Sequence, residues 1–234
     1  MGRKKEYVLL AVLCTVFLIA VAYLFQIWEE YHEADSGYRE LQKYVMEKPE
    51  AGKEHKGQDE NPERGRDNLP EIDFEGLRAV NGDIVAWIRI PGIEVDYPVV
   101  QGEDNEHYLH YTFDGKENIA GSIFLDYRNR ADFTDGKVIL YGHNMQDGSM
   151  FSHLEKYQDA EFRNEQGKVL LYLPDRVLEC EIVECRQVSV RDSVYEIRRE
   201  EKMKAPEQMI LSTCSSESDI RLVLQCTLSR ILIS

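Results

Sequence analysis

The chain has 234 residues, of which 43% are hydrophobic, and this is enough to form the core of one domain with additional segments. Its formal net charge is -15 at pH 7, with 43 acidic residues against 28 basic ones. This negative charge argues against a surface that binds nucleic acid or an anionic membrane. We expect a solvated acidic surface instead.

A basic cluster and a long apolar run open the sequence. Three basic residues at positions 3–5 precede residues 7–28, which contain one amide, Gln26, and no charged side chain. A helix needs about this length to cross a bilayer. The basic cluster predicts that residues 1–6 form a cytoplasmic tail and that the bulk of the chain lies outside the cell.

Two other interpretations stay open for this segment. A signal peptide could be cleaved near the small-x-small sequence at residues 20–22, but the apolar run continues to Trp28 and would leave an apolar new terminus. A buried core helix has a similar composition, although the terminal position and the basic flank speak against it. We therefore predict an uncleaved single-pass anchor, which places the protein at the cell membrane.

Two segments separate the anchor from the first strand pattern. Residues 29–48 carry tyrosine, leucine and valine near helical spacing, which predicts a helix on the domain or between it and the membrane. Residues 49–70 have almost no apolar side chain, so they cannot bury enough surface to order themselves and should form a linker. The predicted juxtamembrane region is therefore 29–71, and the folded domain is 72–234.

From Ile72 onward, short runs rich in Val, Ile, Leu and Tyr alternate with Gly, Pro, Asn and Asp. They predict eight strands, over residues 84–90, 94–101, 121–127, 137–143, 168–174, 178–190, 209–214 and 221–228. Short helices are predicted over 104–113 and 149–165. This pattern favours an all-β fold with short helices, in a closed or nearly closed β-barrel.

Five cysteines occur, and four of them lie beyond the apolar run. Cys180 and Cys185 are five residues apart, so in a regular strand they would point to opposite faces. Cys214 and Cys226 would lie on neighbouring strands about five residues out of register, or ~17 Å, which is beyond disulfide reach. We predict no disulfide framework, although pairings between other strands stay open.

The last predicted hairpin places a thiol near a guanidinium. A polar turn over residues 215–219 separates the run that ends at Cys214 from the next apolar run. A loop of this length sets Cys214 beside Ile220 and Arg221, where the two side chains can meet on one face. A guanidinium stabilises a nucleophilic thiolate and can hold a carbonyl oxygen as it gains charge. The structural alternative is a small core cysteine and a surface arginine.

His143 comes just after the apolar part of a predicted strand and stands in a loop of turn residues that includes Asn144. Histidine titrates near neutrality, so at a strand end it could exchange a proton in a pocket at the barrel rim. A solvent-facing histidine is the alternative. That alternative fits the other histidines better: His32, His55, His107, His110 and, with a role left open, His153. The cysteines and histidines lack the close pairs of a structural zinc site, so we expect no metal.

Several segments resemble the class B sortases. The family's nucleophile pattern is T-L-x-T-C, and residues 210–214 read I-L-S-T-C, with isoleucine in place of the first threonine. The histidine segment YGHNMQDGSMF resembles the class B form over its whole length. So do YRELQKYV and the long stretch from Asn81 to Asn129. The resemblance runs from about Tyr31 to Leu228, and the single N-terminal anchor agrees with it.

The resemblance implies an eight-stranded sortase-type barrel and a cysteine transpeptidase outside a Gram-positive-type membrane. By position, Cys214 corresponds to the nucleophile, His143 to the acid/base, and Arg221 to the arginine that orients the substrate and holds the oxyanion. Neighbouring residues are expected to contact the substrate: Ser212, Thr213, Asn144 and Ser215.

The implied reaction cleaves a C-terminal sorting motif of surface proteins through a thioacyl-enzyme and passes the acyl group to a peptidoglycan amine. It needs no metal or organic cofactor, and it involves no nucleic acid. Wall anchoring is favoured over pilus assembly, both of which occur in class B. Two rivals stay open: a thiol endopeptidase that passes the acyl group to water, and a non-catalytic surface module that binds peptides.

One segment departs from the family pattern. Class B members usually carry a long helix-containing insertion before the nucleophile strand, whereas this chain has about twenty residues, 190–209. That connection helps to form the substrate groove in the family, so its shortness bears on motif preference rather than on the chemistry. Because the segment is highly charged, we expect it to form a solvated helix rather than a dedicated docking patch.

Overall fold

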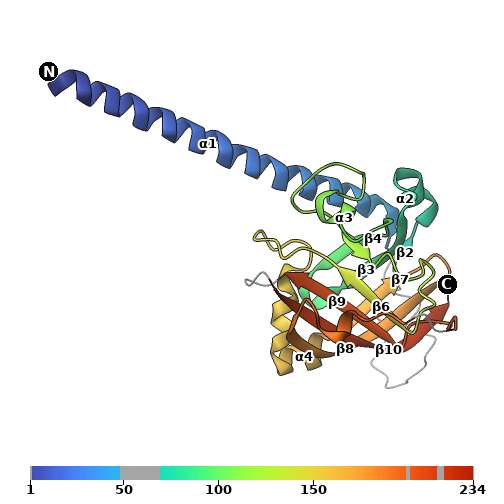
Figure 1. Cartoon of the computed structure of the whole chain (residues 1–234). Helices are drawn as coiled ribbons and strands as arrows, with labels where there is room; N and C mark the ends of the chain where they lie inside the picture. The colour runs from blue at the N-terminus through green and yellow to red at the C-terminus, as the bar shows by residue number, and fades with distance from the viewer. Residues whose placement is uncertain (1, 48–68, 199–200, 215–218, 234) are drawn as a thin grey trace, which may run out of the picture.

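The computed structural model describes residues 2–47, 69–198, 201–214 and 219–233. A long N-terminal helix projects from a compact β-barrel (Figure 1). The linker predicted over 49–70 lies outside the described residues except for its last two positions.

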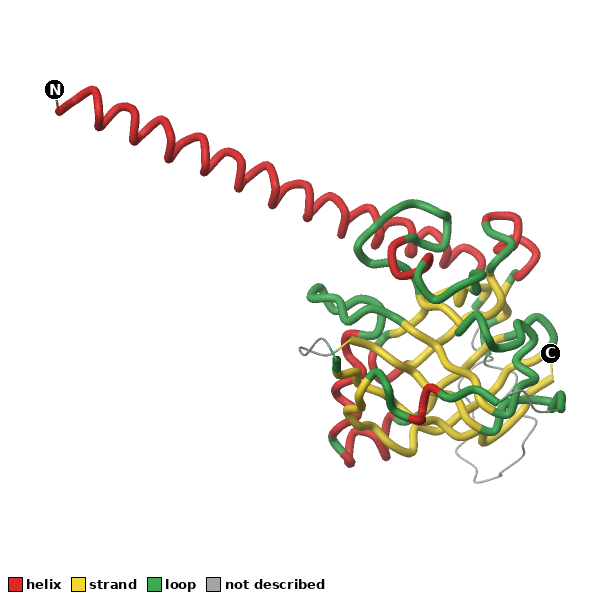
Figure 2. Tube along the Cα trace, viewed as in Figure 1, coloured by secondary structure: helices red, strands yellow, loops and turns green. Residues whose placement is uncertain are grey.

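Eight strands close into a barrel in the order β10-β8-β7-β3-β4-β5-β6-β9, which confirms the predicted fold. The strands are β3 (Ile84–Ile90), β4 (Val95–Val100), β5 (Ile123–Leu125), β6 (Lys137–Tyr141), β7 (Lys168–Tyr172), β8 (Arg176–Ser189), β9 (Gln208–Cys214) and β10 (Ile220–Ile233). Two further strands, β1 (Val45–Met46) and β2 (Glu71–Ile72), pair with each other beside the barrel. Helices and loops gather at the edges of the yellow strands in Figure 2.

The pairing of β6 with β9 is parallel, as is that of β4 with β5, whereas the other neighbours in the barrel are antiparallel. Lys137 is opposite Gln208 at the start of β6 and β9, and Tyr141 is opposite Ser212 near their ends. Both strands therefore finish at the same end of the barrel.

Strand alternation packs side chains on both faces of this region. Inner positions such as Leu140 and Leu211 are fully buried in the main core. The outer face of β6, β8, β9 and β10 carries a second, smaller apolar cluster, made of Ile139, Val188, Ile210 and Val223 together with Val194 from the β8–β9 connection. The outer face is thus covered here rather than open to solvent.

The short helices are α2 (Phe74–Val80), α3 (His107–His110) and α4 (Ala160–Gln166), with 3-10 segments at η2 (Pro91–Ile93) and η3 (Ser152–Gln158). The single helix predicted over 149–165 is divided between η3 and α4. Asp159 causes the division because its carboxylate caps a new helix, accepting hydrogen bonds from the backbone N–H of Glu161 and Phe162 at 2.8 and 3.1 Å.

One continuous helix, α1 (Gly2–Glu40), includes the apolar run and most of the predicted juxtamembrane helix, and η1 (Leu41–Tyr44) follows it. Its length and apolar composition suffice to cross a membrane, properties that a signal sequence shares. The last turns lie on the domain: Tyr38 donates a hydrogen bond to the Gly121 carbonyl at 2.7 Å, and Asn118 donates to the Glu30 carbonyl at 2.9 Å.

Two local expectations are wrong. Of the segment over 190–209, the last two residues begin β9, and the other described residues form only the 3-10 turn η4 (Ser193–Tyr195), because Asp192 caps a single turn and Val194 is buried. Cys180 and Cys185 pack against the same core cluster rather than on opposite faces. A register shift opposite residues 182–184 changes the alternation of β8 by one position.

Candidate active site

The parallel ends of β6 and β9 bring the predicted site residues to one end of the barrel. His143 is two residues beyond β6, and Cys214 is the last residue of β9. Arg221, at the start of β10, is directly opposite Cys214 in the antiparallel register, as the hairpin predicted. Residues directly opposite each other lie on the same face of a sheet. The Cys214 side chain and all of Ser215 lie outside the described part of the structure.

A cavity of about 310 Å³ lies at this end of the barrel. Four of the predicted site residues line it: His143, Arg221, Ser212 and Thr213. Asn144, by contrast, is exposed, pairs with Met150 across its loop and is not among the lining residues.

Tight packing at Gly142 fixes the position of His143. A Cβ atom at Gly142 would lie 2.7 Å from Cδ2 of the fully buried Phe151, so a side chain does not fit. The Gly142 N–H donates to the Ser212 carbonyl at 3.2 Å, and the Phe151 N–H donates to the His143 carbonyl at 2.9 Å. The imidazole Nε2 of His143 lies 2.7 Å from the Leu109 carbonyl oxygen.

Arg221 is half-buried, and its Nη1 donates to the Ile220 carbonyl at 2.9 Å. Ser212 and Thr213 are both buried. Ser212 Oγ shares a hydrogen bond of 2.9 Å with the Tyr195 hydroxyl, whereas Thr213 Oγ1 has no hydrogen-bond partner among the described residues.

The sequence did not indicate five further residues of the cavity lining, which are Asn105, Leu109, His110, Phe124 and Tyr141. The first three belong to the connection between β4 and β5 that contains α3. His110 is exposed, as expected of a surface histidine, but it also lines the cavity. No local pattern predicts this placement, because it depends on how a long connection crosses the barrel end.

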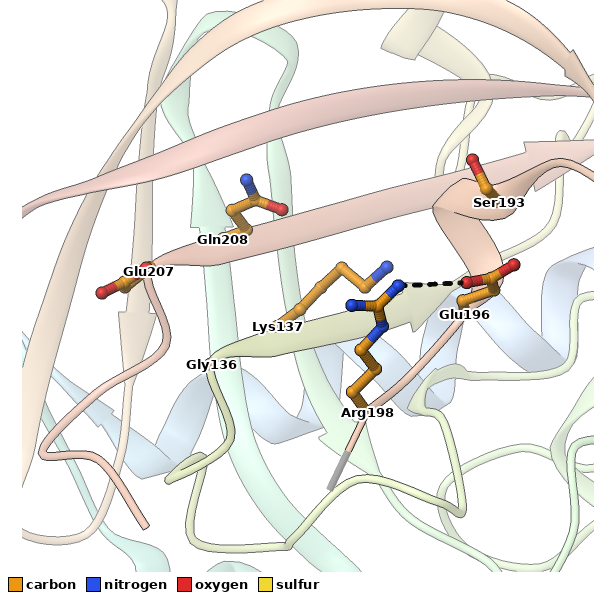
Figure 3. A pocket seen from close by; sticks show the side chains of 7 residues that line it. All are labelled: Gly136, Lys137, Ser193, Glu196, Arg198, Glu207 and Gln208. Atoms are coloured by element: carbon orange, nitrogen blue, oxygen red, sulfur yellow. Dashed lines mark ion pairs between the residues drawn. The ribbon is translucent and has the colours of Figure 1, made fainter. Parts of the chain in front are cut away.

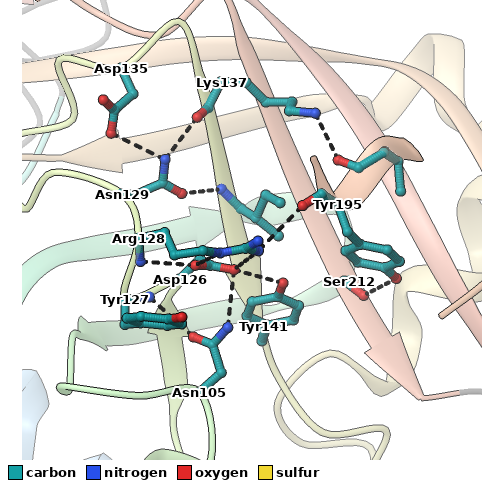
Figure 4. Close-up of polar contacts among 12 residues, drawn as sticks. Asn105, Asp126, Tyr127, Arg128, Asn129, Asp135, Lys137, Tyr141, Tyr195 and Ser212 are labelled. Carbon is teal, nitrogen blue, oxygen red and sulfur yellow. Dashed lines mark hydrogen bonds and ion pairs between the residues drawn. The ribbon is translucent and has the colours of Figure 1, made fainter. Parts of the chain in front are cut away.

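A buried carboxylate, that of Asp126, binds two of these lining residues (Figure 4). Asp126 is fully buried and accepts hydrogen bonds from Arg128 Nε at 2.8 Å and Nη2 at 2.7 Å. The Tyr141 hydroxyl donates to it at 2.9 Å, and the Asn105 amide donates at 3.1 Å. Burial alone would raise the pKa of Asp126, but these donors outweigh it and hold the pKa below its ordinary value.

A second hollow, of about 350 Å³, lies at the opposite ends of β6 and β9 (Figure 3). Its lining is polar and includes Lys137 and an ion pair of 3.9 Å between Glu196 and Arg198. The two side chains of that pair are 66% and 81% exposed, so the pair contributes little to stability. Neither His143 nor Arg221 lines this hollow.

The described residues offer no group of three or more His, Cys, Asp or Glu side chains that could hold a metal ion. Burial raises the pKa of Cys180 to about 12 and that of Cys185 to about 11, and it raises the pKa of Cys226 well above its ordinary value. These three thiols therefore remain protonated near neutral pH and are poor nucleophiles.

Comparison with known families matches residues 88–229, more than half of the chain, to the sortase domain. The chain belongs to the sortase family. Sortase B of Staphylococcus aureus is 35% identical over 146 residues, which cover 58% of this chain and 60% of that relative. Sortase B of Listeria monocytogenes is 48% identical over 90 residues, or 38% of this chain and 37% of the relative.

Solved structures place the fold with the class B sortases. The crystal structure of sortase B from Bacillus anthracis superposes with a TM-score of 0.64 at 26% identity, covering 87% of this chain and 100% of that structure. The sequence matches span less than two thirds of each of the two curated relatives, whereas this structural match spans the whole of the neighbouring chain.

Proposed function

We propose that the chain is a membrane-anchored cysteine transpeptidase of the class B sortase type. It cleaves a C-terminal sorting motif of surface proteins through a thioacyl-enzyme and transfers the acyl group to an amine of a peptidoglycan precursor. The observation that supports this most strongly is the convergence of Cys214, His143 and Arg221 at one end of the barrel, beside a cavity.

Cys214 is the thiol best placed to be the nucleophile. The other described cysteines of the domain have raised pKa values because they are buried. Cys214 instead ends a strand opposite Arg221, and a nearby guanidinium favours the thiolate over the thiol.

In the first half-reaction, the Cys214 thiolate attacks the carbonyl carbon of the scissile peptide bond. Arg221 holds the carbonyl oxygen as it gains charge. The C–N bond breaks as His143 gives a proton to the leaving amine, and a thioester remains on Cys214. In the second half-reaction, an acceptor amine attacks the thioester, gives its proton to His143 and releases the thiolate. Bonds and protons balance without an oxidant, a metal or an organic cofactor.

The hydrogen bond to Leu109 assigns roles to the two ring nitrogens of His143. A backbone carbonyl can only accept, so Nε2 carries a hydrogen in this contact. We therefore assign the proton exchanged in the reaction to Nδ1, while the bond to Leu109 fixes the orientation of the ring.

The membrane topology belongs to the same proposal. Residues 1–6 form a cytoplasmic tail, residues 7–28 cross the membrane, 29–71 form the juxtamembrane region, and the barrel over 72–234 lies outside the cell. The exposed apolar side chains of α1 and the basic residues that precede them support this orientation.

The test uses the full chain in detergent micelles with a fluorescence-quenched peptide library, with and without triglycine as an added primary amine. We expect cleavage of a subset of peptides, an amine-dependent second product, and loss of both with Cys214→Ala. Cleavage by Cys214→Ala at the parent rate would show that this thiol is not the nucleophile. If only the hydrolysed product formed at a high amine concentration, the protein would be a thiol endopeptidase and not a transpeptidase.

A further inference from the structure

The connection between β8 and β9 is held by two cations at consecutive carbonyls. Arg128 Nη2, which binds Asp126 at 2.7 Å, also donates to the Tyr195 carbonyl at 3.3 Å. Lys137 Nζ donates to the neighbouring Val194 carbonyl at 2.9 Å. Both carbonyls belong to η4, so its backbone is fixed to the segments around β5 and β6 (Figure 4).

Tyr195 carries this constraint to the nucleophile strand. Its hydroxyl is 2.9 Å from Ser212 Oγ. Its ring stacks on that of Tyr141, with the ring centroids 6.4 Å apart and the ring planes at 15°. Ser212 is two residues before Cys214 on β9, so the two positions lie on the same face of the strand. The series of contacts that starts at the buried carboxylate therefore ends beside the proposed nucleophile.

η4 packs on the outer face of the barrel and covers part of β9. Val194 is buried in the outer apolar cluster with Ile139, Ile210 and Val223. On this face of β9, Ile210 is the neighbour of Ser212 on the side away from Cys214, and η4 already covers Ile210. An extended peptide that runs from Cys214 along β9 would therefore meet Tyr195 at the level of Ser212.

We propose that the Asp126–Arg128 ion pair is a positioning centre for the peptide-binding groove and acts through Tyr195. It holds η4 as a fixed end wall of the groove, and it holds the ring of Tyr141 as part of the cavity lining. The inference rests on the proposed function. Since none of these contacts moves a proton or the acyl group, their loss affects peptide binding more than the chemical step.

The test compares three variants of the full chain on the best-cleaved peptide of the library. Arg128→Gln removes the ion pair and the bond to Tyr195, whereas Tyr195→Phe removes only the hydroxyl. Each is expected to raise KM about tenfold and to change kcat less than about threefold, since each loses a hydrogen bond that orders the wall. Arg128→Lys keeps the positive charge but lacks the planar guanidinium with its several donors. Its KM should therefore lie between that of Arg128→Gln and that of the parent.

The chain supplies a matched control. Arg130 Nη1 binds Asp135 at 2.6 Å, and the side chain of Asp135 is 3% exposed, so this is another ion pair to a buried carboxylate. Neither residue lines the cavity. Arg130→Gln should lower the melting temperature about as much as Arg128→Gln does, but it should leave KM at the parent value.

Amide hydrogen exchange of residues 192–198 gives a second readout that needs no substrate. Exchange there should accelerate in Arg128→Gln and stay at the parent rate in Arg130→Gln. Unchanged exchange in Arg128→Gln, or an equal rise of KM in both variants, would overturn the positioning role. If the parent cleaves no library peptide, the proposed function fails, and the exchange comparison still decides whether Arg128 holds η4.

Discussion

Adding one methyl group at Gly142 should displace His143, the proposed acid/base. In Gly142→Ala, the new Cβ would lie 2.7 Å from Cδ2 and 3.0 Å from Cγ of Phe151, and 3.3 Å from Cγ1 of Ile123. Both neighbours are fully buried, so they cannot swing away into solvent. The strain should cost about 1–3 kcal/mol, as overpacking of a core does.

For a chain of this size, that cost lowers the melting temperature by about 2–12 °C. The backbone can relieve the contact by moving, and His143 is the next residue. A displacement of a fraction of an ångström should slow acyl-enzyme formation about tenfold or more. We expect stopped-flow acylation and thermal melts of Gly142→Ala to show both effects.

Gly82→Ala is the matched control, because nothing lies within 4 Å of a Cβ at Gly82. That variant should melt and react as the parent does. If Gly142→Ala were indistinguishable from Gly82→Ala in both assays, the close fit between Gly142 and Phe151 would not be what positions His143.

Three further outcomes are expected. Arg221→Lys should slow acyl-enzyme formation by about 10²–10³-fold, because lysine lacks the planar fork that holds the oxygen, and near-parental turnover would contradict this role. Tyr38→Phe removes the 2.7 Å bond to the Gly121 carbonyl and should cost about 1–2 kcal/mol in thermal melts; an unchanged melting temperature would argue against docking of α1 on the domain. The lowered pKa of Asp126 means that its contribution to stability is present above about pH 4 and is lost as the pH falls through its folded-state pKa. The free energy of unfolding of Asp126→Asn should therefore fall less steeply than that of the parent as the pH is lowered. An equally steep fall in the variant would contradict the assignment.

The hairpin that carries Cys214 and Arg221 could be predicted because its register depends on local sequence. Alternating residues define the two strands, and the loop length sets which residues face each other, as the pairing of Arg221 with Cys214 confirms. The eight strands of the barrel could be predicted from short runs rich in Val, Ile, Leu and Tyr that turn residues separate.

The parallel pairing of β6 with β9 had no such signal, because some seventy residues separate the two strands and nothing local fixes their order. The same holds for the cavity wall around Leu109 and for the contacts of Asp126 with Asn105 and Tyr141, which join distant segments. Local irregularities were missed for another reason. The cap at Asp159 and the register shift in β8 each depend on one or two residues within an otherwise regular pattern.

Intact-mass spectrometry of the full chain during turnover examines the thioester itself. Quenching in acid with a cleavable peptide should reveal a species heavier than the free protein by the mass of the N-terminal peptide fragment, and proteolysis should map it to Cys214. Added triglycine should discharge that species into a peptide–amine product. Rapid cleavage with no covalent species on this residue under any quench, or the same adduct formed by Cys214→Ala, would contradict thiol catalysis at this site.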